Sequence, residues 1–345
     1  MKSPRHLLYI LYLSILFNLL ILSCTKKQPF RFTGETMGTT YSIIIADSIV
    51  NPDLIDATKS KVDDVLKQVN RQMSAWDPNS EIALFNRKTD DKPLTISADF
   101  IQVLKLADVI YHESEGAFDP TVGPLVDLWG FGKEGTRFSP PTNEEVENRR
   151  KFVGFDLIEI VDNSKIKKKH PETKLDLSAI AKGFGVDRVA DLLKSIGYKN
   201  FMVEIGGEVV ASGQKKTAKW RIGIDRPYFN AIPGQNLEAV IEVSDVGVAT
   251  SGDYRNYFVS DDKTYSHTID PVTGRPIVNG VASVTVIAPK CAVADAMATA
   301  IMVMGAEKSL EWVKSKNDVE VFIIIRTDEG YEEMFSPGFK KYLSK

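Results

Sequence analysis

The sequence predicts an α+β fold in which mixed or antiparallel sheets carry flanking helices. Segments with a strand-like pattern outnumber helical ones. They are grouped along the chain instead of alternating strictly with helices, which argues against a doubly wound parallel sheet. The chain has 345 residues, enough to bury one large core or two modest lobes. Because it has only two cysteines, this core has to stabilise the fold without a set of disulfides.

In the first half of the chain, β-branched runs, apolar periodicity and turn residues define each expected element. Strands are predicted at residues 40–46 and 156–161, and helices at 53–73, 98–114 and 143–151. The second of these helices should end at Gly116, and the third follows two prolines. The stretch 130–142 is rich in glycine and proline and is predicted to be an exposed loop.

In the second half, a brief strand at 174–177 should lead into a helix at 179–196 that stops at Gly197. Strands are predicted at residues 201–205, 208–213, 220–225, 239–243, 247–251, 281–288 and 319–326. Residues 263–267 are expected to pair with one of the strands that precede them. A helix rich in small residues is expected at 292–304.

Residues 1–23 have the layout of an export signal. Lys2 and Arg5 form a basic start, and residues 7–22 contain no charge. This apolar run is shorter than the about 20 residues that a membrane span needs. It ends in Ile-Leu-Ser-Cys at residues 21–24, which resembles the lipobox of bacterial lipoproteins. We therefore expect a removed signal peptide (1–23), a lipid-bearing tether (24–32) attached through Cys24, and one domain at 33–345.

The alternative for this segment is an N-terminal anchor helix that stays uncleaved. Both interpretations place the remaining chain outside the cytoplasm, as an exported protein held to a membrane and facing the periplasm. Thr25 follows the cysteine and is not the aspartate linked to inner-membrane retention in some bacteria. This favours the outer membrane.

The charge balance argues against a nucleic-acid binder. The chain has 43 Lys and Arg against 46 Asp and Glu, and residues 1–23 hold two of the former and none of the latter. The remainder therefore has 41 basic and 46 acidic side chains, a net charge of −5 that favours solubility without a basic face. With Cys24 lipidated, Cys291 has no disulfide partner and is expected to be a small buried apolar residue.

The helix expected near residues 291–305 contains a carboxylate among very small and apolar side chains. Asp295 and Thr299 are four residues apart and therefore share one face of the helix. A buried carboxylate is costly unless it is paired or metal-bound, and carboxylate and hydroxyl oxygens suit a hard ion such as Mg²⁺. Alternatively, the helix dipole stabilises Asp295, and the Thr299 hydroxyl donates a hydrogen bond to a carbonyl of the preceding turn. Spacing alone leaves both open.

Three other segments contain residues that suit binding or proton transfer. Around the start of the helix at 179–196, Lys182 could bind a phosphate with the free amides of the first turn, although an ordinary capped surface helix explains the pattern as well. The turn-rich stretch 116–124 lets backbone approach a ligand closely. His267 ends an expected strand where the chain turns, a position that suits a general base or a structural histidine.

Taken in order, these segments resemble the motifs of the ApbE family. The resemblance covers nearly the whole chain after residue 33. The matching motifs are Met37-Gly-Thr-Thr-Tyr41, Met73-Ser-Ala-Trp76-Asp-Pro-Asn-Ser-Glu-Ile82, residues 116–124 and 176–183, Ile205-Gly-Gly-Glu208, and residues 266–276 and 292–299. The resemblance implies an ApbE-like α+β fold with two closely packed lobes and an FAD site between them.

The resemblance also implies a function, that of a magnesium-dependent FAD:protein FMN transferase. Such an enzyme cleaves the pyrophosphate of FAD, releases AMP, and attaches FMN through a phosphoester to a threonine or serine. Family acceptors carry an Asp-x-x-Thr/Ser-Gly-Ala-Thr/Ser-like motif and belong to exported subunits of redox systems such as Rnf and Nqr.

Site residues follow from the same resemblance. His267 matches the residue that deprotonates the acceptor hydroxyl. The magnesium ligands would be the side chains of Asp295 and Thr299 and the backbone carbonyls of Ala179 and Ala298. The FAD contacts would be Met37, Trp76, Ala117, Phe118, Asp119, Asp176, Lys182 and Ile269.

Trp76 departs from the family pattern, in which transferases mostly have tyrosine there and enzymes that hydrolyse FAD have asparagine. A bulky aromatic side chain favours exclusion of water and therefore transfer. Two alternatives remain: a magnesium-dependent FAD pyrophosphatase that yields FMN and AMP, and a non-catalytic FAD-binding lipoprotein. Because simple storage of FAD has little need of a metal, the Asp295 and Thr299 pair argues against the second.

Overall fold

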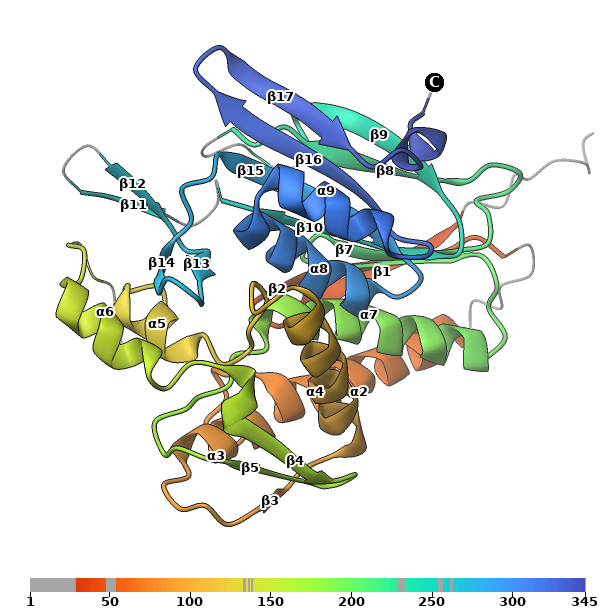
Figure 1. Ribbon diagram of the computed structural model, residues 1–345. Helices are drawn as coiled ribbons and strands as arrows, with labels where there is room; N and C mark the ends of the chain where they lie inside the picture. The colour runs from red at the N-terminus through yellow and green to blue at the C-terminus, as the bar shows by residue number, and fades with distance from the viewer. Residues whose placement is uncertain are drawn as a thin grey trace, which may run out of the picture.

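The computed structural model describes residues 29–47, 54–132, 135, 137, 139–228, 232, 234–253, 257–260 and 263–344. An eight-stranded sheet in which every neighbouring pair is antiparallel forms the centre of the fold (Figure 1). In spatial order its strands are β1 (Phe30–Thr36), β2 (Thr39–Ile45), β6 (Phe201–Ile205), β7 (Glu208–Ser212), β10 (Val246–Gly252), β15 (Val281–Ala288), β16 (Glu320–Thr327) and β17 (Gly330–Phe335).

Both faces of this sheet are covered, which explains why β15 is buried along its whole length. All eight residues of that strand are buried, because a strand in the middle of a two-sided core has no solvent face. Helices α7 (Ser178–Ser195) and α8 (Cys291–Met304) cover one face, with α9 (Ala306–Lys314) beside them. The hairpin of β8 (Trp220–Asp225) and β9 (Leu237–Val243), with the 3-10 helix η3 (Phe339–Tyr342), covers the other.

A mainly helical lobe is inserted between β2 and β6 and lies below the sheet in Figure 1. It contains α2 (Ile55–Met73), α3 (Glu81–Arg87), α4 (Ala98–Glu113), η2 (Phe155–Leu157) and the small sheet β3 (Leu94–Thr95), β5 (Lys165–Lys168), β4 (Ile158–Asp162). Ser80 and Ser97 cap α3 and α4 by accepting bonds from N–H groups of their first turns. One hydrophobic cluster contains Phe100 and Leu104 of this lobe together with Ile301 of α8, so the two lobes share a core.

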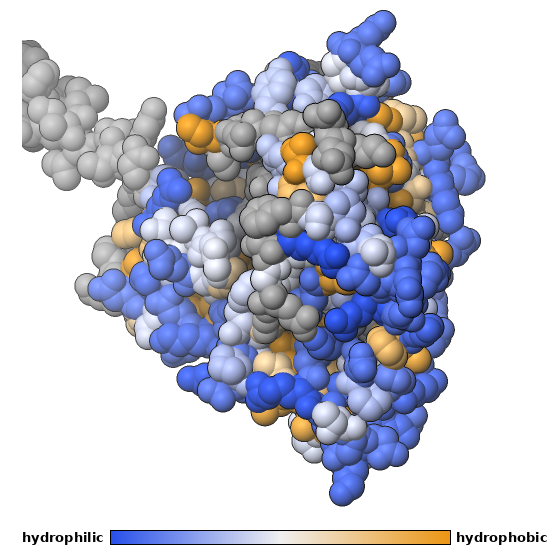
Figure 2. Space-filling view, turned by 90° about the vertical axis from the view of Figure 1, so that its left-hand side faces the viewer, coloured by the Kyte–Doolittle hydropathy of each residue, from blue (hydrophilic) through white to orange (hydrophobic). Residues whose placement is uncertain are grey.

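A third group of short elements flanks the helical lobe and the sheet. It consists of α5 (Gly123–Leu128), α6 (Asn143–Arg150) and the hairpins β11 (Tyr257–Ser260) with β12 (Lys263–Ser266) and β13 (Ile269–Asp270) with β14 (Arg275–Pro276). The Trp129 indole donates to the Gly274 carbonyl at 2.8 Å and fastens the second hairpin to the end of α5. Figure 2 shows this side of the molecule, where hydrophilic residues predominate and hydrophobic residues form small separate areas.

The structure confirms the α+β fold and most of the predicted elements, and it corrects two predictions. Residues 174–177 form no strand, because Leu175 exchanges both of its backbone hydrogen bonds with the side chain of Asn86, at 2.8 Å each, and no neighbouring strand takes them. The strand at 263–266 pairs with β11, which had not been predicted, and not with one of the strands predicted before it.

The bounds of the predicted domain stay a prediction. Strand β1 begins at Phe30, three residues before the expected domain start, while residues 1–23 and Cys24 lie outside the described residues. Cys291 is fully buried and reduced, as expected. Among the residues that the structure describes, no helix combines the length and the apolar character that crossing a bilayer takes.

Trp220 should be a main stabilising contact of the β8–β9 hairpin on the sheet. Its ring is 2% exposed and its Nε1 donates to the Ser212 carbonyl at 2.9 Å. We expect Trp220→Ala to lower the free energy of unfolding by about 3–5 kcal/mol. Trp220→Phe, which mainly loses the hydrogen bond, should cost about 1–2 kcal/mol. Urea unfolding measures both, with Leu84→Ala at an exposed position as the control. A loss below about 1 kcal/mol for Trp220→Ala would contradict this role.

Candidate active site

Helices α7 and α8 cross so closely that their contact requires a glycine. A Cβ atom on Gly183 would lie 2.5 Å from the carbonyl oxygen of Cys291 and 2.8 Å from the Cβ of Asp295. Any larger residue would therefore push the two helices apart. The backbone N–H of Gly183 uses this proximity and donates to Asp295 Oδ2 at 2.9 Å. The carboxylate of α8 is thus held against the first turns of α7.

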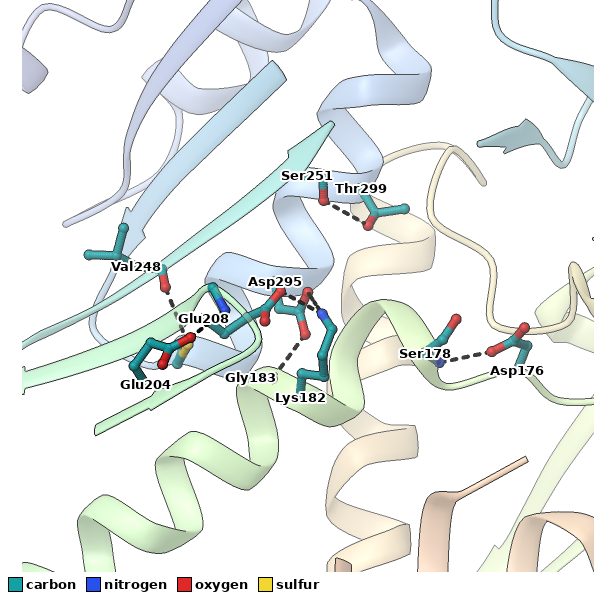
Figure 3. A network of polar contacts seen from close by, with 12 residues as sticks. Asp176, Ser178, Lys182, Gly183, Glu204, Glu208, Val248, Ser251, Asp295 and Thr299 are labelled. Atoms are coloured by element: carbon teal, nitrogen blue, oxygen red, sulfur yellow. Dashed lines mark hydrogen bonds and ion pairs between the residues drawn. The ribbon is translucent and has the colours of Figure 1, made fainter. Parts of the chain in front are cut away.

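Lys182, the residue before that glycine, joins two carboxylates (Figure 3). Its ammonium donates to Glu208 Oε1 at 2.5 Å and lies 3.9 Å from Asp295 Oδ1. Glu208 and Asp295 are each 3% exposed, whereas 30% of the Lys182 side chain is exposed. The cluster therefore combines one partly solvated cation with two buried acids, and with both acids ionised its net charge is negative.

Burial governs the electrostatics of this cluster. It raises the pKa of Asp295, against the opposing effects of Lys182 and the Gly183 N–H. Burial and then the neighbouring Asp295 also raise the pKa of Glu208. Burial alone would lower the pKa of Lys182, but the two carboxylates outweigh it and raise that pKa above its ordinary value. Glu208 Oε2 is buried without a hydrogen-bond partner among the described residues. The cluster is therefore suited to receive a further positive charge or donor.

The residues predicted to bind a metal lie around this cluster. Thr299 is one turn beyond Asp295 on α8, and its hydroxyl shares a hydrogen bond of 3.3 Å with Ser251 on β10 (Figure 3). Ala298 is fully buried beside it. Ala179 lies in the first turn of α7, where regular helical geometry would pair its carbonyl with the Gly183 N–H. Because the Gly183 N–H donates to Asp295, the Asp295 carboxylate competes with the Ala179 carbonyl for this donor. The competition favours an Ala179 carbonyl that is available to another partner.

This donor set fits a magnesium ion by its chemistry. It combines a carboxylate, a hydroxyl and backbone carbonyls, all of them hard oxygen ligands. Within the described part of the chain, no three His, Cys, Asp or Glu side chains gather as a metal-binding group. The Asp295 and Thr299 set is thus a mixed oxygen site with a single carboxylate, which leaves room for water and phosphate oxygens.

Two tight turns border the cluster on the side of the sheet. Met37 adopts a positive φ of 50° in the turn between β1 and β2, and its side chain packs over Gly185, where a Cβ would lie 2.7 Å from the methionine methyl. Gly206 has a φ of 58°, and a Cβ there would meet Thr39 at 2.8 Å and the Lys182 chain at 3.5 Å. The Gly206 turn therefore brings backbone close to the Lys182 side chain, while the Met37 side chain packs on α7.

The loop with Ala117, Phe118 and Asp119 joins the site at the start of α7. All three residues are buried, and Asp119 Oδ1 accepts bonds of 2.7 Å from both the N–H and the hydroxyl of Thr121. Burial raises the pKa of Asp119 to about 6 although these two donors oppose it. The loop is tied to Asp176 because the Asp176 N–H donates to the Pro120 carbonyl at 2.7 Å.

Asp176 itself orders the entry to α7. Its Oδ1 accepts the Ser178 N–H at 2.8 Å (Figure 3), one of the amides that a helix start leaves unpaired. Ser178 is the first residue of the helix, and the residue at the N-cap position is Leu177, which makes no side-chain capping bond.

His267 and Ile269 approach from the flank. Ile269 is buried with Leu125 and Trp129, and His267 lies edge-on to Phe131 with ring centroids 6.3 Å apart. His267 is half-buried between β12 and β13. The histidine is thus carried by the flanking hairpins, whereas the Lys182–Glu208–Asp295 cluster is carried by α7, α8 and the sheet.

Trp76 lies in the turn between α2 and α3, and the residue is 74% exposed. Its backbone N–H donates to the Ser74 hydroxyl at 3.3 Å, and the Ser80 hydroxyl closes the same turn on the Ser74 carbonyl at 2.7 Å. The turn is ordered while the indole faces solvent, which suits a side chain that stacks on a ligand ring.

The structure brings Lys182 and Asp295 into one cluster and links Asp176 to the loop that contains Asp119 through the Pro120 carbonyl. Glu208 was not predicted as a site residue. Its only signal was the Gly-Gly-Glu sequence after a strand, which alone is more often architectural. Glu208 becomes a site residue because β7 starts where the Lys182 side chain ends.

Comparison with known proteins agrees with this architecture. The ApbE family matches residues 37–323. A protein of Vibrio cholerae named FAD:protein FMN transferase is 44% identical over 331 residues, covering 95% of this chain and 97% of its own length. A Haemophilus influenzae protein of the same name is 41% identical, covering 95% of this chain and 96% of its own length.

Solved structures agree as well. The flavin transferase ApbE from Vibrio cholerae has a TM-score of 0.81 at 42% identity and covers 92% of this chain and 99% of its own. The apo form of the Pseudomonas stutzeri flavinyl transferase ApbE has a TM-score of 0.82 at 33% identity and covers 93% of this chain and 98% of its own. With this fold and these relatives, the chain belongs to the ApbE family.

Proposed function

We propose that the chain is an FAD:protein FMN transferase that moves FMN from FAD to a hydroxyl of an acceptor protein. The observation that carries the proposal is the buried Lys182–Glu208–Asp295 cluster at the start of α7, a site whose charge suits a metal-bound pyrophosphate. The names of relatives that cover nearly all of this chain support it. Purified protein incubated with FAD, Mg²⁺ and candidate acceptors should give covalent flavin fluorescence on a denaturing gel and one AMP per flavin attached.

Magnesium belongs to the proposal. Asp295, Thr299 and the carbonyls of Ala179 and Ala298 would hold it. When bound, the ion supplies positive charge that neutralises the pyrophosphate and stabilises departing AMP. Lys182 would bind a phosphate oxygen next to it, since its ammonium is partly exposed while Glu208 fixes its direction.

The protein's own contribution to the reaction is positioning and proton transfer. The new bond joins the acceptor oxygen to the phosphorus of the FMN half, and the bond from that phosphorus to the AMP oxygen breaks. His267 would take the proton of the acceptor hydroxyl, a role that suits its half-buried place on the flank. Met37, Ile269 and the loop with Ala117, Phe118 and Asp119 would contact FAD, and Trp76 would stack on one of its rings.

Hydrolysis of FAD to FMN and AMP is the second candidate function, and the exposure of Trp76 is the observation that keeps it open. An indole that covers the flavin excludes water and favours transfer, whereas one that stays in solvent leaves the phosphorus accessible to water. AMP released without an acceptor separates the two reactions. A non-catalytic FAD carrier is disfavoured, because two buried acids beside a lysine are an expensive arrangement for storage.

The place of action is part of the same proposal. Residues 1–23 would act as a lipoprotein signal and Cys24 would carry the lipid, which places the enzyme at the periplasmic side of a membrane. Its acceptors would be exported subunits of Rnf- or Nqr-type redox complexes with an Asp-x-x-Thr/Ser-Gly-Ala-Thr/Ser-like motif. Radiolabelled palmitate incorporated into the unchanged chain but not into Cys24→Ala would test the anchor.

His267→Ala should abolish transfer and leave FAD binding nearly intact. Removing a general base costs about 10²- to 10⁴-fold in rate, whereas the proposed FAD contacts other than Ile269 lie on other segments. Gel fluorescence measures transfer, and equilibrium dialysis of FAD measures binding. Transfer by His267→Ala at the rate of the unchanged protein would refute the proposed base.

Asp295→Asn should remove the response to magnesium. The substitution keeps the shape of the side chain but removes its charge and leaves one oxygen to coordinate the ion. We therefore expect the rate of transfer at about 1 mM Mg²⁺ to fall by roughly 100-fold or more. Asp191→Asn, on an exposed turn of α7, is the matched control and should behave as the unchanged protein. Normal magnesium dependence of Asp295→Asn would exclude Asp295 as a ligand.

Trp76→Asn should shift the balance from transfer towards hydrolysis. The smaller amide covers less of the bound ligand, and water then competes with the acceptor hydroxyl. We expect more AMP release without acceptor and less covalent flavin with it, relative to Trp76→Tyr as the aromatic control. Equal AMP release by both variants would mean that the residue does not control access of water.

A further inference from the structure

A carboxylate of α7 that has no part in the proposed reaction holds the N-terminus of α8. Asp187 accepts the N–H groups of Cys291 and Ala292, each at 3.0 Å and each on a different oxygen. These two amides are among the four that a helix start leaves unpaired. The residue at the N-cap position, Lys290, provides no side-chain hydrogen bond. Asp187, which is 8% exposed, therefore acts as a cap supplied by another helix.

Each of the two helices contributes a carboxylate that accepts backbone N–H groups of the other helix. Asp187 of α7 binds backbone amides of α8, and Asp295 of α8 binds the Gly183 amide of α7. Gly183 and Asp187 are four residues apart, as are Cys291 and Asp295, so each pair lies on one face of its helix. The contact between the helices thus has two polar links about one turn apart. In one of them α7 provides the carboxylate, and in the other α8 does.

Such links are needed because the side chains of α8 alone do not fix where it sits along its axis. Ten of its fourteen residues are buried, and apart from Asp295 and Thr299 its side chains are small or apolar, so their packing defines its rotation and height only loosely. Apolar contacts tolerate small shifts, whereas a hydrogen bond weakens steeply with distance and angle. The sheet limits the first turn as well, since a Cβ on Gly247 would lie 2.4 Å from the Cys291 nitrogen.

We propose that Asp187 is a positioning residue that sets the height of α8 along α7 and thereby places Asp295 and Thr299. This inference rests on the proposed function, because those two residues are the proposed side-chain ligands. One rigid turn of α8, from Cys291 to Asp295, connects the amides that Asp187 binds to the proposed ligands. A shift of the first turn is therefore passed on to the site.

Asp187→Asn is the direct test. The amide keeps the shape of the side chain but can accept at only one atom, and its NH₂ group would face a backbone N–H. A partner that orients a ligand changes metal affinity by about 10- to 100-fold when it is altered, so we expect Mn²⁺ to bind that much more weakly. Mn²⁺ is measured by EPR in the presence of ADP, which has the pyrophosphate but no riboflavin to transfer.

Two further readouts distinguish positioning from a general loss of stability. The Mg²⁺ concentration for half-maximal transfer should rise by the same factor, while the rate at saturating Mg²⁺ changes far less. Hydrogen exchange at the Cys291 and Ala292 amides should accelerate. Asp47→Asn is the matched control, because Asp47 likewise accepts two backbone amides, at 3.0 and 3.2 Å, but at the far end of β2. It should lower stability without altering Mn²⁺ binding.

Asp187→Glu provides a second variant that keeps the charge and lengthens the side chain by one methylene group. It should fold and still weaken Mn²⁺ binding, because it displaces the first turn of α8. A folded variant of either kind that binds Mn²⁺ and ADP as tightly as the unchanged protein would overturn the inference. If the unchanged protein transfers no FMN when FAD, Mg²⁺ and acceptor are all present, it is the proposed function that fails.

Discussion

The close crossing of α7 and α8 is the constraint on which the rest of the site depends. Gly183 lets the helices approach, and the approach puts the Asp295 carboxylate within 2.9 Å of a backbone N–H of the other helix. Lys182 follows from the same geometry, since it precedes the glycine and its chain extends towards Glu208. A side chain at position 183 would separate all three parts at once, so one small residue supports the whole polar arrangement.

The cost of this arrangement explains its composition. Two acids that are 3% exposed lose most of their hydration, and a single ammonium offsets only one of them. With both acids ionised, the surplus negative charge destabilises the protein alone, as does Glu208 Oε2, which has no hydrogen-bond partner among the described residues. The fold therefore holds charged side chains, at a cost in stability, where a cation and phosphate oxygens can pair with them. This is the pattern expected of a site that binds charged groups.

The sequence predicted those parts of the fold whose signals are local. The uncharged, mostly apolar segment Val281–Ala288 and the small-residue pattern before Met304 identify a buried strand and a buried helix without further information. The error at residues 174–177 arose because Asn86, far away in the chain, takes the bonds a strand would need. Local patterns do not contain that partner.

The candidate site shows the same division. The spacing of Asp295 and Thr299 predicts that they share one face of a helix, but only the fold reveals that Lys182 and Gly183, over a hundred positions away, meet Asp295. Glu208 could not be selected from sequence because its burial results from the pairing of β7 within the sheet. The role of Asp187 was equally hidden, since the amides it binds belong to a helix that begins at Cys291.

The order of strands in the sheet has a consequence for how the chain folds. Ser42 of β2 is paired with Glu204 of β6, so two adjacent strands are separated by 162 positions, with the whole helical lobe between them. Contacts of such long range form slowly, because closing the loop costs entropy before any pairing repays it. The helical lobe, built from nearby segments, can collapse earlier. Glu208 and Asp295 then stay hydrated until the sheet closes, and the costly burial of these acids is a late event in folding.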